Sequence, residues 1–185
     1  TQDSSSAASD VYKRQFPSSI GVITSESGAV FSDIVHRIKD RFPLEIILYP
    51  VKVQGESSAT EICNALDYFE NYKNNNFDKP DVIIIARGGG SLEDLMSFNS
   101  EKIAHAIFNS DIPIISAVGH ETDFSISDFV SDYRASTPTA AADVVVPEKK
   151  ELLERLELLS ENKKNYIESL ITVSYTHLRA HETSN

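Results

Sequence analysis

Short apolar runs alternate along the chain with longer stretches in which apolar residues recur every three or four positions. Four of the short runs are apolar at nearly every residue, and they cover residues 20–24, 45–49, 81–86 and 113–118. Such runs are typical of parallel strands buried on both faces of a sheet, and the connections between them are long enough for helical crossovers. The pattern predicts an α/β domain in three layers, with helices on both faces of an open, mostly parallel sheet.

The stretches between these strands have the spacing of amphipathic helices. The first covers residues 29–42, and Ser58 with Glu61 has the spacing of a capping box at the start of the second. We expect the third crossover to cover residues 92–108, in two pieces that separate near Asn99. The apolar stripes of these helices are predicted to cover the sheet.

A change of pattern marks the end of this domain. Thr137, followed by Pro138, is expected to cap a last short helix. From Pro147 onward a heptad spacing begins, interrupted by one lysine, at Leu152, Leu156, Leu159, Lys163, Tyr166 and Leu170. The heptads predict the start of a long coiled-coil-type helix. The alternative is a single amphipathic helix that packs on its own domain.

These patterns divide the chain into four parts. We expect the α/β domain to span residues 16–147 and the helical region to begin over residues 148–171. Residues 1–15 and 172–185 show no hydrophobic period. They are predicted to be tails outside the fold, the first of them disordered.

The composition is that of a globular protein, and its acidity restricts the function. The 185 residues carry a net charge of −11, and 41% of them are hydrophobic. A surface that holds nucleic acid by bulk charge needs clustered Lys and Arg, so this chain is not expected to do so. Cys63 is the single cysteine, which predicts no internal disulfide and a cytoplasmic location. Neither a membrane span nor a signal for export is indicated.

Polar residues gather where three of the predicted strands end. Ser25 follows the first strand, Arg87 follows the third and Gly119 follows the fourth. The carboxyl ends of parallel strands meet at one edge of a sheet, where open α/β sheets bind their ligands. We therefore expect these loops to form one site.

The loop after the third strand is rich in glycine and begins with an arginine. Its residues are Arg87, Gly88, Gly89, Gly90 and Ser91. Glycine amides ahead of a helix can cradle an anion such as phosphate, and the planar fork of Arg87 can hold further oxygens. The alternative is a tight turn in which Arg87 pairs with Glu93 or Asp94.

A histidine and two acids add acid–base chemistry. His120 and Asp123 stand three residues apart after the fourth strand, so on a helix they would share a face and the carboxylate would orient the imidazole. Such an imidazole can take or give a proton near neutral pH, although a structural role is the alternative. Asp33 lies on the first predicted helix, where the pattern alone favours a solvated acid.

Several of these residues belong to longer motifs in a characteristic order. The motifs are residues 20–25 (IGVITS), 32–34 (SDI), 49–55 (YPVKVQG), 87–95 (RGGGSLEDL), 116–123 (SAVGHETD) and 137–138 (TP). Over about residues 16–171 the chain resembles the exodeoxyribonuclease VII large subunit. The resemblance implies a cytoplasmic enzyme that hydrolyses single-stranded DNA from either end to oligonucleotides. It also implies that several small subunits bind the helical region, and that the family's DNA-binding OB-fold domain is not among the matching residues.

The resemblance also assigns roles to individual positions. The implied catalytic residues are Asp33, Arg87, His120 and Asp123, and for Asp33 the resemblance overrides the solvated acid. Contacts to the DNA are expected from Ser25, Gly88, Gly89, Gly90, Ser91, Glu121 and Thr122. Asp33 and Asp123 are candidate ligands for Mg²⁺, which the family does not strictly require.

Two other functions fit the same residues. A flavodoxin-like module would hold a nucleotide or flavin phosphate at the glycine loop without hydrolysis, and it would have no use for His120. A structural partner domain would act through its heptad helix alone.

Overall fold

A computed structural model of the chain describes residues 16–26, 29–72, 78–89, 95–119 and 122–182. The predicted tail over residues 1–15 and the last three residues lie outside this description. The chain divides into two units, Thr1–Pro147 and Glu148–Asn185. The first contains the sheet and its helices, and the second contains one long helix.

The sheet has five strands, all parallel. They are β1 (Ser19–Thr24), β2 (Glu45–Pro50), β3 (Val82–Ala86), β4 (Ile114–Ala117) and β5 (Tyr133–Arg134), in the order β2-β1-β3-β4-β5. The four predicted strands are confirmed within a residue or two. The two-residue β5 was missed, because so short a pairing leaves no pattern of apolar residues.

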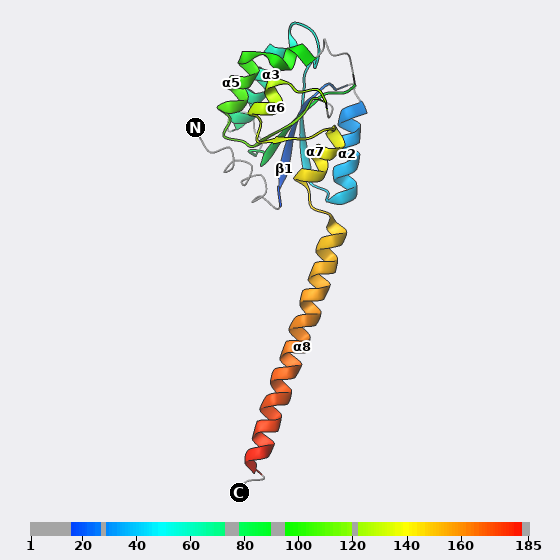
Figure 1. Cartoon of the computed structure of the whole chain (residues 1–185), viewed down its shortest axis with the longest axis vertical. Coiled ribbons are helices and arrows are strands. Elements are labelled where there is room, and N and C mark those ends of the chain that lie inside the picture. The colour runs from blue at the N-terminus through cyan, green and yellow to red at the C-terminus, as the bar shows by residue number, and fades with distance from the viewer. Residues whose placement is uncertain (1–15, 27–28, 73–77, 90–94, 120–121, 183–185) are drawn as a thin grey trace. The chain divides into compact units, whose positions relative to one another are not determined.

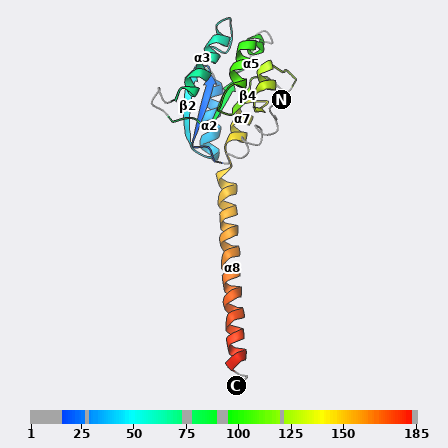
Figure 2. The ribbon, with the colours of Figure 1, turned by 90° about the vertical axis from the view of Figure 1, so that its left-hand side faces the viewer.

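Helices cover both faces of the sheet, as predicted. The helices α2 (Ala29–Arg41) and α7 (Pro138–Val145) pack on one face, and α3 (Ser58–Glu70), α5 (Glu101–Phe108) and α6 (Ile126–Val130) lie on the other (Figure 1). The view turned by 90° shows β2 and β4 on opposite sides of β1 (Figure 2). The hydrophobic core is therefore split by the sheet into two clusters.

Alternation along β1 shows how one strand serves both clusters. Ile20 and Val22 join the cluster under α2 and α7, whereas Ile23 joins the one under α3 and α5. Gly21 points to the second face, where a Cβ atom would lie 3.1 Å from Cζ of Phe69 and 3.2 Å from Cγ1 of Ile83. Glycine at this position lets the ring of Phe69 in α3 pack directly against the strand.

The starts of two helices test the predicted caps. Thr137 caps α7 as predicted, because its Oγ1 accepts a hydrogen bond from the backbone N–H of Ala140 at 3.0 Å. The capping box predicted at Ser58 is wrong. The N-cap of α3 is Ser57, and its side chain makes no capping hydrogen bond. Ser58 lies inside the helix and donates its hydroxyl to the carbonyl oxygen of Gly55 instead.

The third crossover is broken near Asn99, as predicted. A 3-10 helix, η2 (Met96–Asn99), ends there and α5 begins at Glu101. The Asn99 side-chain oxygen accepts a hydrogen bond from the backbone N–H of Ile126 at 2.8 Å. This bond ties the break to the first residue of α6.

The second unit is the helix α8 (Lys149–Glu182). It contains the predicted heptad region and continues through residues 172–182, where no hydrophobic period is visible in the sequence. Its apolar seam is open, with Leu156 62% exposed and Leu159 56% exposed. In the described part of the chain, no helix combines the length and apolar character needed to cross a bilayer.

The burial of the Phe69 ring predicts a large loss of stability when the ring is removed. Phe69 is fully buried against Gly21 and two other aromatic rings, so Phe69→Ala is expected to lower the free energy of unfolding by about 3–5 kcal/mol. Denaturant unfolding of the chain measures this change. Phe108→Ala is the matched control, because Phe108 is 64% exposed and its loss should cost less than about 0.5 kcal/mol. Equal effects of the two variants would contradict the described packing.

Candidate active site

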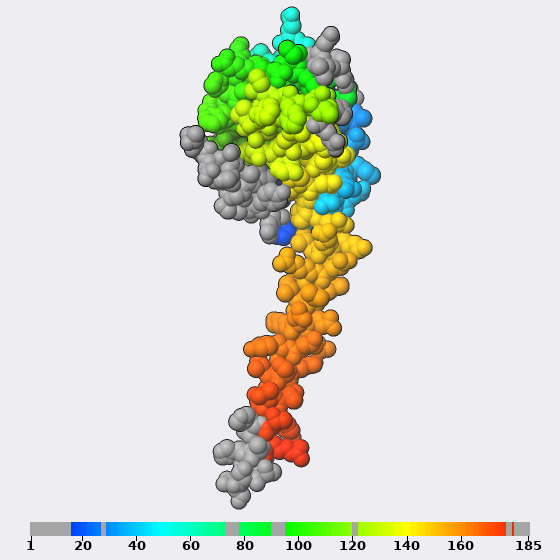
Figure 3. Space-filling model, in the orientation of Figure 1, coloured from blue at the N-terminus to red at the C-terminus, as the bar shows by residue number. Residues whose placement is uncertain are grey.

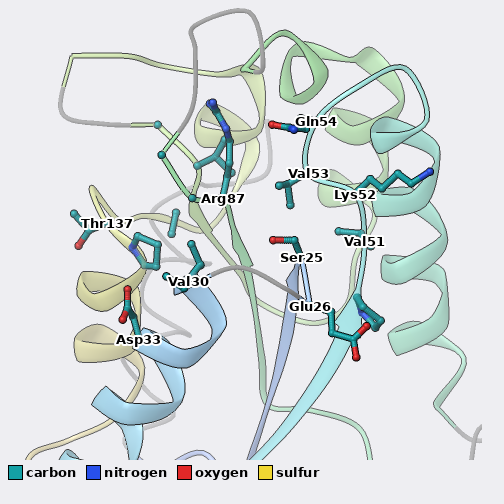
Figure 4. A pocket seen from close by; sticks show the side chains of 18 of the residues that line it. Ser25, Glu26, Val30, Asp33, Val51, Lys52, Val53, Gln54, Arg87 and Thr137 are labelled. Atoms are coloured by element: carbon teal, nitrogen blue, oxygen red, sulfur yellow. The ribbon is translucent and has the colours of Figure 1, made fainter.

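A pocket of about 1040 Å³ opens at the carboxyl edge of the sheet (Figure 4). It lies at the ends of β1, β2, β3 and β4 and at the starts of α2 and α7. Among its lining residues are Ser25, Asp33, Lys52, Arg87, Gly119 and Thr137. β1 and β3 are neighbours here, and the strand order reverses between them, which is where open α/β sheets bind ligands. The edge predicted from the sequence is therefore the edge that is hollowed.

Arg87 follows the last residue of β3 and lines the pocket. Its backbone N–H donates to the carbonyl oxygen of Ala117 at 3.2 Å, which continues the pairing of β3 with β4. The residue is only 7% exposed, and its side chain extends from the strand end in Figure 4. A guanidinium offers a planar fork of hydrogen-bond donors that fits the oxygens of an anion. The alternative partners Glu93 and Asp94 lie outside the described residues.

The described part of the glycine run adjoins Arg87. Gly88 and Gly89 both line the pocket. A Cβ atom on Gly88 would lie 3.1 Å from Cγ2 of Val30 in α2, so glycine at this position permits the close approach of the loop to that helix. Gly90 and Ser91 lie outside the described residues. The anion cradle predicted from the sequence is thus placed at the pocket in its first two residues.

Asp33 and Ser25 enter the pocket from two other elements. Asp33 lies early in α2 and is exposed, and Ser25 directly follows β1. Both are shown around the hollow in Figure 4. The structure therefore brings together five of the predicted site residues, which are Ser25, Asp33, Arg87, Gly88 and Gly89.

Asp123 and Thr122 lie beside this pocket and are not among the residues that line it. The Asp123 carbonyl packs against Gly119, where any Cβ atom would clash with it, and Gly119 itself lines the pocket. Residues 122–125 are not helical, so the shared helical face considered for His120 and Asp123 does not form in the described part of this segment. His120 and Glu121 lie outside the described residues.

One wall of the pocket was missed as a site by the sequence analysis. It is formed by Pro50, the last residue of β2, and by Val51, Lys52, Val53 and Gln54 of the loop that follows. The loop is fastened to the end of β1 by the backbone N–H of Val51, which donates to the carbonyl oxygen of Thr24 at 3.0 Å. The signal was present, because the second predicted strand ends at the same edge and Lys52 follows it.

Glu61 of α3 holds this loop in place. Its Oε2 accepts from the backbone N–H of Lys52 at 2.8 Å and its Oε1 accepts from the Ser57 hydroxyl at 2.9 Å. These hydrogen bonds, led by the one from Lys52, lower the pKa of Glu61 below its ordinary value. The Lys52 ammonium, whose side chain is 73% exposed, lies 4.0 Å from the same carboxylate. This wall of the pocket thus carries the positive charge of Lys52. The nearby carboxylate of Glu61 already accepts hydrogen bonds from the Lys52 backbone and from Ser57.

The described residues do not assemble a Mg²⁺ site. Within the part of the chain that the structure describes, no group of three or more His, Cys, Asp or Glu side chains is placed to hold a metal ion. Asp33 lines the pocket and Asp123 does not, so the two candidate ligands are not presented as a pair.

Comparison of the sequence with known proteins identifies the family. The sequence model of the family "Exonuclease VII, large subunit" matches residues 8–184. The chain belongs to this family. The resemblance inferred from the motifs is confirmed, and the match is wider than residues 16–171 at both ends.

Relatives with this name are similar over most of the chain. The "Exodeoxyribonuclease 7 large subunit" of Rickettsia bellii is 50% identical over 166 residues, which are 90% of this chain and 36% of that protein. The proteins of the same name from Rickettsia akari (59% over 131 residues, 71% of this chain and 29% of that protein) and Clostridioides difficile (58% over 134 residues, 72% and 32%) are similar too. The chain therefore spans about a third of the length of these curated relatives.

Glu61 gives a prediction about acid stability. A carboxylate with a lowered pKa stabilises the fold above its ordinary pKa, and this contribution is lost as the pH falls through the lowered value. Glu61→Gln should therefore melt below the unchanged chain at pH 7, and the difference should shrink and disappear as the pH falls well below the ordinary pKa of a glutamate. Thermal unfolding across this range measures it. Glu56→Gln, in an exposed position of the same loop, is the control, and a gap for Glu61→Gln that is constant with pH would refute the linkage.

Proposed function

We propose that this chain is the catalytic part of an exodeoxyribonuclease that hydrolyses phosphodiester bonds of single-stranded DNA from either end to oligonucleotides. The observation that carries the proposal is Arg87, a buried arginine that lines a pocket at the reversal of strand order together with Gly88 and Gly89. Family membership supports the same conclusion. The strand order alone is shared with flavodoxin-like proteins, but a fold does not specify an activity.

The chemistry is an in-line attack of water on the phosphorus of the DNA backbone. The guanidinium of Arg87 and the amides of the glycine loop bind the phosphoryl oxygens and stabilise the charge that develops on them. His120 accepts the proton of the attacking water, Asp123 sets the tautomer of its imidazole and Asp33 positions the water. The P–O bond to the leaving nucleotide breaks, and the departing oxygen takes up a proton. Ser25, Ser91, Glu121 and Thr122 contact the DNA.

The charge of the α/β unit supports a division of labour. Between Ser18 and Pro147 the sequence has nine basic and nineteen acidic residues, so this unit attracts DNA locally, at Arg87 and the glycine loop. Most of the binding of the single-stranded DNA then comes from other parts of the longer protein. The small subunit binds through the helical region that α8 begins, where Leu156 and Leu159 are exposed. The complex works in the cytoplasm, in keeping with a single unpaired cysteine.

Replacement of Arg87 tests the proposed function. In the full-length protein assembled with its small subunit, Arg87→Ala should lower kcat for release of soluble oligonucleotides by about 10²–10³-fold, by analogy with the loss of one oxyanion donor. Arg37→Ala is the matched control, because Arg37 pairs with Asp143 between α2 and α7 and should leave kcat within about twofold. Near-native cleavage by Arg87→Ala would refute the assignment. Full activity of His120→Ala would remove His120 from the proposed chemistry, whereas an unchanged complex that binds DNA but releases no oligonucleotides would favour a phosphate-binding module.

A separate prediction concerns the cleavage of single-stranded DNA in the absence of divalent metal ions. The proposed stabilisation of phosphoryl charge comes from Arg87 and backbone amides, so cleavage of single-stranded DNA should continue in excess EDTA. The rate of oligonucleotide release before and after chelation measures this. Complete loss of cleavage, restored by added Mg²⁺, would show that the proposed set of groups lacks an essential member.

A further inference from the structure

A buried carboxylate lies under the segment that follows β4. Asp128, in the short helix α6, has a fully buried side chain. Its Oδ1 accepts from the hydroxyl of Ser116 in β4 at 2.5 Å, and its Oδ2 accepts from the backbone N–H and the hydroxyl of Ser125, each at 2.9 Å. Asp128 therefore joins the buried end of a central strand to the residue at which the segment over residues 119–125 ends.

Arg134 of β5 extends this network to Asp123. Its Nε lies 3.8 Å from Oδ2 of Asp128, and its Nη2 donates to the backbone carbonyl of Asp123 at 3.4 Å. The guanidinium carbon lies 4.1 Å from the centre of the Phe124 ring, within the range of a cation–π contact. The fork of Arg134 thus contacts the segment at two successive residues.

Gly119, at the start of the segment, packs against the Asp123 carbonyl and the Asp128 carboxylate. A Cβ atom at this position would clash with the Asp123 carbonyl and would lie 3.1 Å from Oδ2 of Asp128. The two ends of the segment therefore meet over the Asp128 carboxylate. His120 lies between them in the sequence. The surface of α6 lies on the near face of the α/β unit in Figure 3.

We propose that Asp128 and Arg134 are positioning residues for the hydrolysis, which hold Asp123 and the backbone on both sides of His120 in a fixed relation to the end of β4. The inference rests on the proposed function and deepens it. Neither residue touches the substrate. Both act through the backbone of Gly119 and of residues 123–125.

The physical reason is that the described part of this segment has no regular secondary structure of its own. Residues 122–125 are not helical, and α6 is five residues long, which is far too short to be stable in isolation. A carboxylate without exposure to water is costly unless it is paired and fully hydrogen-bonded, and here Ser116, Ser125 and Arg134 supply those partners. Catalytic groups must be placed closely, since displacement by about 1 Å costs on the order of 10²-fold in rate.

The test uses the full-length protein assembled with its small subunit. Asp128→Asn keeps the size of the side chain and removes the charge that faces Arg134, while Arg134→Lys keeps a charge and removes the fork. Both should lower kcat on single-stranded DNA about 10–100-fold with KM within about twofold. Arg134→Ala should fall below Arg134→Lys, so that the conservative variant is a partial rescue.

The matched control is Glu70→Gln. Glu70 also accepts from a serine hydroxyl and a backbone N–H, those of Ser110 at 2.6 Å and Asp111 at 2.9 Å, but these groups precede β4 and lie at the opposite end of the strand. Its loss should lower the melting temperature and leave kcat unchanged. Hydrogen exchange should accelerate at the amides of residues 123–126 in Asp128→Asn and stay unchanged there in Glu70→Gln.

The outcomes separate this inference from the function on which it rests. Unaltered kcat in folded Arg134→Ala, in an enzyme that Arg87→Ala inactivates, overturns the positioning role and leaves the nuclease assignment intact. A fall in kcat that simply follows the melting temperature, equal in Asp128→Asn and Glu70→Gln, shows a purely structural carboxylate and overturns it too. A full-length complex that cleaves no DNA refutes the proposed function, and the positioning role falls with it.

Discussion

The site depends on one constraint, the order of strands in an all-parallel sheet. The chain adds β2 on one side of β1 and then β3, β4 and β5 on the other. The connection after β1 therefore leaves toward the face of α2, while the one after β3 leaves toward the face of η2 and α5. No crossover helix covers the point between two such diverging connections, and a crevice remains there. Ser25 and Arg87, far apart in the sequence, line one pocket for this reason.

Burial on both faces decides where polar groups are placed. The strand interiors must be apolar, because α2 and α7 exclude water from one face and α3 and α5 from the other. The described strands β1 and β3 accordingly contain no charged side chain, and Arg87 comes directly after the last residue of β3. Arg87 stands at this boundary, with its backbone paired to β4 and its side chain at the pocket. A rigid scaffold thus presents the planar donor fork of an arginine at the pocket.

Two acids of this acidic chain organise loops on either side of the pocket. Glu61 accepts a backbone N–H and a serine hydroxyl in the region after β2. Asp128 accepts the same two kinds of donor in the segment after β4. In both cases the carboxylate is turned to its own backbone. Part of the negative charge, which is unfavourable for binding DNA, therefore belongs to carboxylates that hold the loops around the pocket in place.

The sequence specifies the local elements, since hydrophobic period and capping chemistry act between near neighbours. It predicted four strands, the break at Asn99, the Thr137 cap and the edge that carries Ser25, Arg87 and the glycines. The tertiary structure set the order of the strands and the pairing of β5. It also placed Asp123 beside the pocket, against Gly119 and under Arg134. These features arise from contacts between residues remote in sequence, for which a single chain carries no local pattern.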